Sequence, residues 1–427
     1  MSRKLAHRSH GTRPVLPACI VTMMIIALLA GAATAAEEVT IDGVIHVRNG
    51  AEPRDGVEDL QLEELWRVGG EDDEENIFGL ITRVVADDDN NMYLLDTQLS
   101  QVNVFTPDGE FSHTLSREGE GPGEIRIPID MLMMPDGTLG LVQAFPGQII
   151  CVDLEDNPAE TFVPGGDDPT TGGFLSLSDV QSAGGHLVLG GVFSTINQQE
   201  GFQIRDHFIR SYNADGTQKL SFLNDPKKYE FSNLNIVEAE QYFPQFRKWI
   251  LAEDGRIYVA SYREQYRIDV YEADGTLSRV IEREYEHWQR TEEEYALIDG
   301  ILEAQLRNVP FPVERSVSEI DEDINSLMLD KDGQLWVLTG RGFRDPPEGA
   351  IVMYDVFDTE GVFVKQVRVP IAGDGTRDGI MFAGDERMVL VKGFTDALVS
   401  LQTQGAGPSL SDEEEPGPME VICYAIK

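Results

Sequence analysis

Short apolar runs alternate with tight polar turns along most of the chain. A representative unit has an apolar run at 132–134, the turn dipeptide Asp136-Gly137 and a second apolar run at 139–142. Asp-Gly, Asn-Asn and Gly-Gly favour two-residue hairpin turns because they tolerate a positive φ angle. Turns of this kind begin at residues 90, 136, 184, 254, 332 and 384, which divides the chain into six units.

Each unit continues with a third apolar run, and most units add a second turn and a fourth run, as in Asp108-Gly109 before residues 111–115. The third runs lie at 102–105, 149–152, 208–212, 268–271, 351–354 and 421–424. Four antiparallel strands repeated at intervals of roughly 40 to 50 residues are typical of β-propeller blades. We therefore predict an all-β fold, a six-bladed β-propeller with four-stranded antiparallel blades.

One segment has the pattern of a helix rather than of a strand. Thr291 precedes three glutamates, as an N-cap residue precedes an acidic first turn. Tyr295, Ile298 and Leu302 then recur on one helical face. A parallel β/α fold would need such a segment in every unit. We predict one inserted helix that lies on the propeller.

The last unit ends after its third run, because the chain stops at Lys427. An open blade edge would leave backbone groups unpaired. Residues 62–68 form the unused strand-like segment near the start of the chain. We predict that they close the ring as the outer strand of the last blade, beside residues 421–423, and that residues 39–47 add a further edge segment.

The connection between the first two units carries a recognisable motif. Val-Phe-Thr-Pro-Asp-Gly at 104–109 is followed by Gly-Glu-Gly-Pro-Gly-Glu at 119–124. This closely resembles the junction of NHL-type repeats and of secreted bacterial six-bladed β-propellers of the NHL-repeat-like group. By repeat pattern the resemblance covers 60–427, although the later junctions at 163–166 and 224–226 keep only turn character. It implies the fold more strongly than a function, because propellers include enzymes, receptors and scaffolds.

The N-terminal segment differs in composition from the rest. Four basic residues and no acid precede an apolar run at 19–29, and Ala33-Thr34-Ala35 follows as a small-residue cleavage pattern. The alternative, a retained membrane anchor, needs about 20 apolar residues, which is more than this run provides. We predict a cleaved signal peptide at 1–35, an N-terminal extension at 36–59 and the propeller at 60–427. The mature protein is then periplasmic or extracellular, without a membrane attachment.

The charge balance excludes one class of partner. The chain has 34 Lys and Arg against 75 Asp and Glu, a formal net charge of -41. Binding to nucleic acid needs clustered cations that neutralise phosphates, so we expect no nucleic-acid partner. Five histidines remain after residue 35, without a metal-ligand spacing, and we expect no metal or other cofactor. Cys151 and Cys423 fall in non-adjacent units, so we predict that both are free thiols.

The lengths of the connections indicate a binding face. In a four-stranded blade, the first-to-second and third-to-fourth connections lie on one side of the disc, and here they are short. The other side receives nearly all the long connections, at 165–173, 193–206, 227–246, 282–308 and 340–349. Long loops are where recognition residues concentrate. That side also carries an aromatic residue and several cations, which we predict to bind the ligand: Phe145, Arg205, Arg263, Arg341 and Arg344.

Two roles for these arginines stay open. They can pair with anionic or hydroxyl groups of a ligand over the central channel, or each can be satisfied by a local carboxylate while the loops merely cap the disc. Two function classes stay open as well. The first is an exported, non-catalytic binding module for a small molecule, glycan, peptide or protein partner. The alternative is a propeller hydrolase or lyase with a metal or acid–base site in the channel, which two or more channel histidines near acids would favour.

Overall fold

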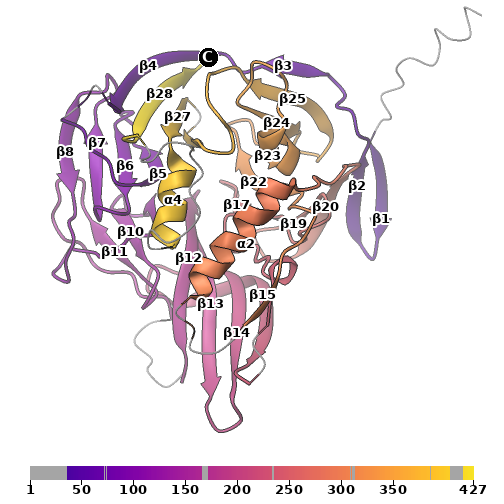
Figure 1. The fold of residues 1–427 in the computed structure, drawn as a ribbon, viewed down its shortest axis with the longest axis horizontal. Coiled ribbons are helices and arrows are strands. Elements are labelled where there is room, and N and C mark those ends of the chain that lie inside the picture. Colours follow the sequence, from indigo (N-terminus) through magenta and orange to yellow (C-terminus); the bar gives the residue numbers. More distant parts are fainter. Residues whose placement is uncertain are drawn as a thin grey trace, which may run out of the picture.

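The computed structural model describes residues 36–403 and 417–427, apart from 72, 74, 166–171, 233–234, 308, 310–312 and 385. Six sheets are arranged around a centre, which confirms the predicted six-bladed β-propeller (Figure 1). The first strands of the six blades surround the central channel. The predicted signal peptide at 1–35 lies outside the described residues. No described helix is long and apolar enough to cross a membrane.

The first three blades take up the first half of the propeller. Blade one contains β5 (Ile81–Ala86), β6 (Met92–Asp96), β7 (Gln101–Phe105) and β8 (Phe111–Leu115). Blade two contains β9 (Asp130–Met133), β10 (Leu139–Gln143) and β11 (Gln148–Val152). Blade three contains β12 (Phe174–Ala183), β13 (His186–Asn197), β14 (Phe202–Tyr212) and β15 (Gln218–Glu230).

The other three blades complete the ring. Blade four contains β17 (Trp249–Leu251), β18 (Ile257–Val259), β19 (Arg267–Tyr271) and β20 (Leu277–Arg283). Blade five contains β22 (Ile324–Leu329), β23 (Leu335–Thr339), β24 (Val352–Phe357) and β25 (Phe363–Val369). Blade six contains β26 (Gly379–Ala383), β27 (Arg387–Lys392), β28 (Glu420–Ile426) and, from the start of the chain, β4 (Leu62–Gly69).

The ring closes as the sequence predicts. β4 pairs antiparallel with β28, with Val68 opposite Val421 and Trp66 opposite Cys423. Trp66 is buried and its ring stacks on that of Phe105 in blade one, with 5.8 Å between the ring centroids. The N-terminal strand therefore joins the two blades on either side of the seam.

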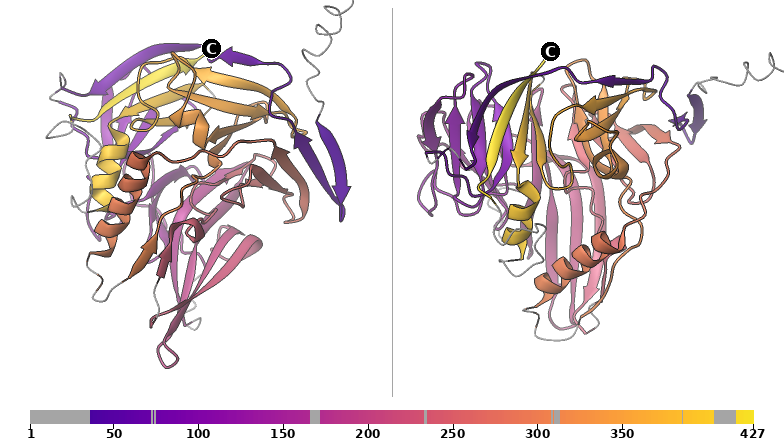
Figure 2. Two further views of the ribbon diagram at one scale, coloured as in Figure 1. Left: turned by 45° about the vertical axis from the view of Figure 1, so that its right-hand side comes forward. Right: turned by 45° about the horizontal axis from the view of Figure 1, so that its top comes forward.

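The residues before β4 add strands to two other blades (Figure 2). β1 (Glu37–Ile41) and β2 (Val44–Asn49) form a hairpin, and β2 pairs parallel with the outer strand β20 of blade four. β3 (Val57–Asp59) pairs parallel with the outer strand β25 of blade five. The predicted edge segment at 39–47 thus exists, but it extends blade four and not blade six. Both β2 and β3 thus cover backbone groups on the outer edge of a blade.

Two blades depart from the predicted four short strands. Blade two has three strands, and residues 158–162 make only isolated bridges to β11. Pro158 and Pro164 flank this segment and have no backbone N–H to donate, which limits a fourth strand there. Blade three departs in the other direction, because the expected loop at 193–206 is the paired end of β13 and β14, and β15 continues to Glu230. These strands project beyond the rest of the disc (Figure 1).

The predicted helix is α2 (Glu292–Leu306), which begins after Thr291 with a capping box to Glu294. The prediction of a single helix is wrong, because α4 (Phe394–Gln402) lies between β27 and β28. Its N-cap is Gly393, without a capping side chain, so no N-terminal signal marks it in the sequence. The short α3 (Gly340–Arg344) and the 3-10 helix η2 (Glu238–Glu240) complete the described helices.

The remaining sheet and the two cysteines complete the fold. β16 (Asn235–Val237) and β21 (Glu314–Ser316) form a two-stranded parallel sheet away from the blades. Cys151 and Cys423 are both buried and free, which confirms the predicted absence of a disulfide between them.

Candidate functional site

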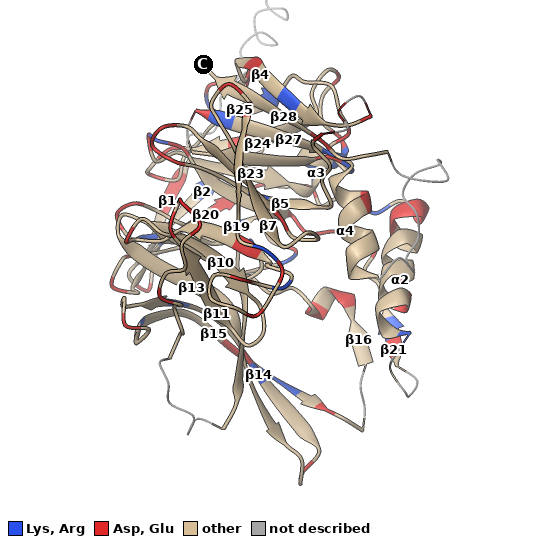
Figure 3. Ribbon diagram, turned by 90° about the vertical axis from the view of Figure 1, so that its left-hand side faces the viewer, with Lys and Arg blue, Asp and Glu red and all other residues tan. Residues whose placement is uncertain are grey.

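The long connections lie together on one side of the propeller. In side view α2, α4, β16 and β21 all lie on the same side of the blades (Figure 3). All of them belong to second-to-third or blade-to-blade connections. We call this side the long-loop face, and the opposite side the short-turn face.

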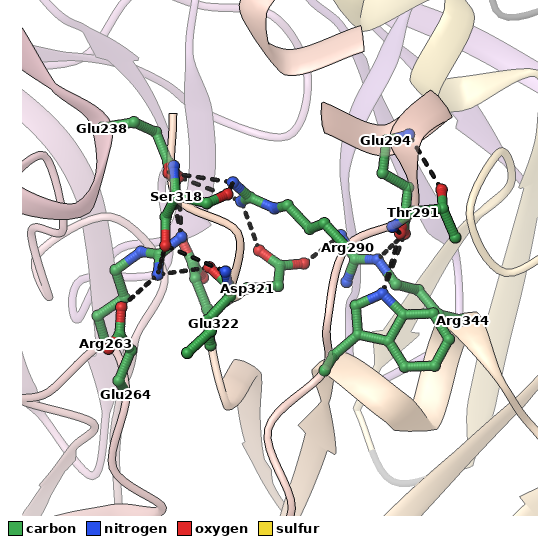
Figure 4. Close-up of polar contacts among 12 residues, drawn as sticks. Glu238, Arg263, Glu264, Arg290, Thr291, Glu294, Ser318, Asp321, Glu322 and Arg344 are labelled. Carbon is green, nitrogen blue, oxygen red and sulfur yellow. Dashed lines mark hydrogen bonds and ion pairs between the residues drawn. The ribbon is translucent and has the colours of Figure 1, made fainter. Parts of the chain in front are cut away.

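One carboxylate on the long-loop face holds two buried arginines (Figure 4). Glu238, in η2, accepts hydrogen bonds from Nη2 of Arg263 at 3.0 Å and from Nη1 of Arg290 at 3.0 Å. It also accepts one from the backbone N–H of Ser318, at 3.0 Å. The side chains of Arg263 and Arg290 are only 7% and 3% exposed. Glu238 therefore ties blade four to the connections that precede blade five.

The same chain of ion pairs continues to blade five and to α2. Nη2 of Arg290 donates to Asp321 at 2.7 Å, and Asp321 also pairs with Arg344 of α3. Nε of Arg344 donates to Glu294 of α2 at 2.6 Å. We call this group, from Arg263 through Glu238, Arg290, Asp321 and Arg344 to Glu294, the arginine network.

The network keeps its acids ionised. Burial opposes ionisation of Glu238, but the hydrogen bonds from Arg290 and Ser318 and the charge of Arg263 hold the pKa of its carboxyl below the usual value. Burial likewise opposes ionisation of Asp321, but Arg344 and Arg290 lower its pKa. Two of the predicted ligand-binding residues, Arg263 and Arg344, thus have local carboxylate partners.

The other predicted residues lie in different surroundings. Arg341, in α3, pairs with Glu286 at 3.1 Å, and its guanidinium lies 5.6 Å from the centre of the Trp288 ring. Arg205, on β14, is exposed, and the described residues offer it no ion pair. Phe145, between β10 and β11, is 61% exposed and contacts only Phe174 among the described aromatic rings. The structure thus groups the arginines of blades four and five and leaves Phe145 and Arg205 on other blades.

A groove on the long-loop face separates the end of β15 from blade four. It has a volume of about 660 Å³. Three tyrosines, Tyr229, Tyr242 and Tyr262, and two lysines, Lys227 and Lys228, line it. We call it the tyrosine groove. Its remaining lining residues are Glu230, Asn235, Val237, Ala239, Glu240, Gln241, Ser261 and Arg263.

Two of the three tyrosine rings of the groove contact an arginine. The guanidinium of Arg205 lies 4.9 Å from the centre of the Tyr229 ring, and that of Arg267 lies 5.0 Å from the centre of the Tyr262 ring. Burial raises the pKa of Tyr229, so its phenol stays neutral at physiological pH. The hydroxyl of Tyr242 donates to the backbone carbonyl of Ala260 at 2.8 Å. The groove therefore offers aromatic faces in fixed orientations.

The lysines of the groove remain largely accessible. Lys227 is 46% exposed and pairs with Asp225 at 3.1 Å. Lys228 is 53% exposed and pairs with Glu230 at 3.0 Å. Aromatic faces beside accessible ammonium groups suit a ligand that combines a ring with hydroxyl or anionic groups. The sequence identified residues 227–246 only as a long connection. The signal within it is the Lys-Lys-Tyr run at 227–229, in an otherwise acidic chain.

The histidines do not gather at the channel. His207 is buried, stacks on Phe243 with 4.0 Å between ring centroids, and has its pKa lowered to about 4 by burial. His287 contacts Asp323 at 2.7 Å, and His46 contacts Glu282 at 3.3 Å. The described residues that line the central cavity include no histidine. Within the described ranges, no group of three or more His, Cys, Asp or Glu is placed to hold a metal ion.

Comparison with known proteins agrees with the architecture. A family model described as "Two component regulator propeller" matches residues 318–341, which include β22 and β23 of blade five. No curated protein sequence matches the chain. This match covers a small part of the chain. It does not identify the NHL-type group.

Solved structures with a similar fold cover nearly the whole propeller. A candidate exported protein from Bacteroides fragilis is 10% identical, with a TM-score of 0.46, over 90% of this chain and 99% of that one. A member of the DUF4221 family from Bacteroides vulgatus is 10% identical, with a TM-score of 0.47, over 86% and 99%. A gluconolactonase from Xanthomonas campestris is 12% identical, with a TM-score of 0.41, over 92% and 98%. The chain is a six-bladed β-propeller.

Proposed function

We propose that this protein is an exported binding module of the NHL-repeat-like group of six-bladed propellers, and that it binds its ligand in the tyrosine groove without transforming it. A glycan fits this groove best among the small-molecule, glycan, peptide and protein ligands that the sequence left open. The observation that carries the proposal is the groove itself, in which three tyrosines and two accessible lysines meet in a protein with a formal net charge of -41.

The chemistry of a sugar ring matches the lining of the groove. One face of a pyranose ring presents C–H groups and packs against an aromatic ring, while its hydroxyls need hydrogen-bond partners. Tyr262 is 41% exposed and supplies such an aromatic face. Lys227, which lies on the same face of β15 as Tyr229, supplies donors, and its charge favours a saccharide that carries carboxylate groups.

The arginine network supports the groove without taking part in binding. Arg263 lines the groove, but its guanidinium is engaged by Glu238, Glu264 and the carbonyl of Ile320. It therefore holds the groove wall in place before a ligand arrives, which lowers the entropic cost of binding. Arg205 has the corresponding role behind Tyr229.

The proposal is tested by titrating the mature protein with a panel of neutral and uronic-acid oligosaccharides in a calorimeter. We expect saturable binding to at least one uronic-acid member, weakened about tenfold or more by Tyr262→Ala and by Lys227→Ala, because each removes a contact of about 1.4 kcal/mol or more. The matched control is Tyr295→Ala, since Tyr295 is also 41% exposed but lies on α2, outside the groove.

Two results would contradict the proposal. One is the absence of saturable binding across the whole panel. The other is binding that survives both groove substitutions with unchanged affinity. A melting temperature close to that of the unmodified protein establishes that each variant is folded, because both side chains are largely exposed.

A further inference from the structure

The central channel contains a cavity that is separate from the tyrosine groove. Its volume is about 610 Å³, and the first strands of all six blades contribute to its wall. It extends down to residues beside the short first-to-second turns, including Ala86, Ser182 and Glu253, and so reaches the short-turn face. A cavity of this size accommodates a small organic molecule.

Two buried acids lie together at the inner end of this cavity. Asp130 begins β9 and Asp179 lies on the neighbouring strand β12, and each is 1% exposed. The carboxylate of Asp130 accepts hydrogen bonds from the backbone N–H groups of Met131 at 2.8 Å and Val180 at 3.4 Å. The Oδ2 atom of Asp179 has no hydrogen-bond partner among the described residues. Asp179 also lines the cavity, and its carboxyl group lies within hydrogen-bonding reach of the Asp130 carboxylate.

The pKa of Asp179 lies well above that of an ordinary aspartate. Burial, and then the charge of Asp130, raise the pKa of Asp179 to about 7, while Arg83 and Arg247 act in the opposite direction. In its neutral form the carboxyl group of Asp179 donates a hydrogen bond instead of accepting one. The acceptor beside it is the carboxylate of Asp130.

Two guanidinium groups flank this acid. Arg83 lies on β5 and pairs through Nε with Asp130 at 3.3 Å, and its side chain is 33% exposed. Arg247 precedes β17 and is exposed, and its one hydrogen bond within the described chain, from Nη2 to the carbonyl of Thr82, is long at 3.5 Å. Both arginines line the cavity. With Asp179 neutral, two positive charges face a single negative charge on Asp130.

The rest of the cavity wall is largely apolar. Below the charged end it is lined by apolar residues, among them Val84, Leu132, Leu251, Leu327 and Met381. An occupant therefore needs an anionic end and an apolar body. At the arginine end a single excess positive charge matches a monoanion. The nearby Asp130, with Glu253 at the short-turn end of the same cavity, disfavours a doubly charged group such as a phosphate monoester.

We propose that the central channel is a second binding site, which takes a small monocarboxylate with an apolar body through the short-turn face. Its carboxylate accepts hydrogen bonds from the guanidinium groups of Arg83 and Arg247. Charge-assisted bonds of an arginine to a carboxylate are among the strongest polar contacts in proteins. The apolar body lies against the residues of the inner strands.

The test is calorimetric titration of the mature protein at pH 7 with phenylacetate, octanoate and acetate, and with 2-phenylethanol as an uncharged analogue. We expect one-to-one binding of phenylacetate or octanoate. Acetate and 2-phenylethanol are expected to bind at least tenfold more weakly, because each lacks one of the two matched parts. Arg247→Ala is expected to weaken binding at least tenfold. Asp179→Asn is expected to keep binding, because both guanidinium groups remain.

Two control variants show whether binding is specific to this cavity. Arg117→Ala removes an arginine that is 73% exposed and lies outside the cavity, and we expect unchanged affinity. Tyr262→Ala is expected to leave phenylacetate binding unchanged as well, so the two sites succeed or fail independently. Failure of all three carboxylates to bind, or binding that is unaffected by Arg247→Ala, would overturn the proposal.

Discussion

At the scale of single residues, Glu238 joins separate segments of the long-loop face. Its two carboxylate oxygens satisfy two buried guanidinium groups and one backbone N–H. Removing one partner of a buried ion pair costs more than the pair contributes, because it leaves the other charge uncompensated. Neither arginine has solvent to replace this carboxylate.

We predict that Glu238→Gln lowers the free energy of unfolding by about 3 kcal/mol. The measurement is urea denaturation followed by tryptophan fluorescence. Glu240→Gln is the control from the same short helix, because Glu240 is exposed, and its effect should stay below about 0.5 kcal/mol. Equal and small effects of the two substitutions would mean that the arginine network does not stabilise the fold.

Asp179 gives a second prediction at this scale, about pH. Its pKa is raised to about 7 in the folded protein by burial and by Asp130, against Arg83 and Arg247, while an aspartate in the unfolded chain titrates near 3.9. The folded state therefore binds this proton more tightly. The stabilisation that it provides is complete below about pH 4 and is lost as the pH rises through about 7.

The amide in Asp179→Asn cannot titrate. We therefore predict that this variant does not show the loss of stability that Asp179 causes as the pH rises. Between pH 5 and pH 8 the melting temperature of the unmodified protein should fall further than that of the variant. The difference between the two profiles isolates Asp179 from the general repulsion among the other acids. Parallel profiles would contradict the prediction.

At the scale of elements, the sequence was informative where local signals suffice. The turn dipeptides located the blades, and Thr291 with its glutamates located α2. The position of β4 followed from the need to pair the edge of β28. The paired ends of β13 and β14 were missed because the connection at 197–202 has no turn dipeptide of the kind that marks the blades. α4 was missed because it has no N-cap side chain.

The candidate site was predicted less completely for a physical reason. Arginines in an acidic chain are noticeable, but their partners are distant in sequence. Glu238 lies 25 residues from Arg263 and 52 residues from Arg290. The tyrosine groove also joins β15, β16 and the loop after β18, which only the three-dimensional fold brings together. Periodicity predicts strands, but it does not predict which connections meet.

The closing strand β4 allows a direct test of ring closure. We predict that Trp66→Ala lowers the free energy of unfolding by about 3 to 5 kcal/mol, because a buried indole leaves a large cavity at the seam between blades six and one. Chemical denaturation measures the effect. Leu65→Ala, at a neighbouring residue that is 38% exposed, is the control and should change stability much less. A similar loss in both variants would argue against a packed seam.

At the scale of the whole molecule, the propeller carries its two proposed sites on opposite sides. The groove lies among the long connections, and the channel cavity reaches the short-turn face. Acidic residues are distributed over both sides (Figure 3). Such a surface charge keeps a protein soluble and repels anions at long range. Anionic ligands are therefore held by close contacts with a few cations and not by the overall field.

Hydrogen–deuterium exchange with and without the best-binding oligosaccharide of the panel tests ligand binding in the tyrosine groove most directly. We predict slower exchange on binding in residues 227–232, 235–242 and 261–263, and unchanged exchange in the inner strands β5, β9 and β12 of the channel. Slower exchange that is confined to the channel strands or to blades one and two, with none in the groove segments, would contradict binding in the groove.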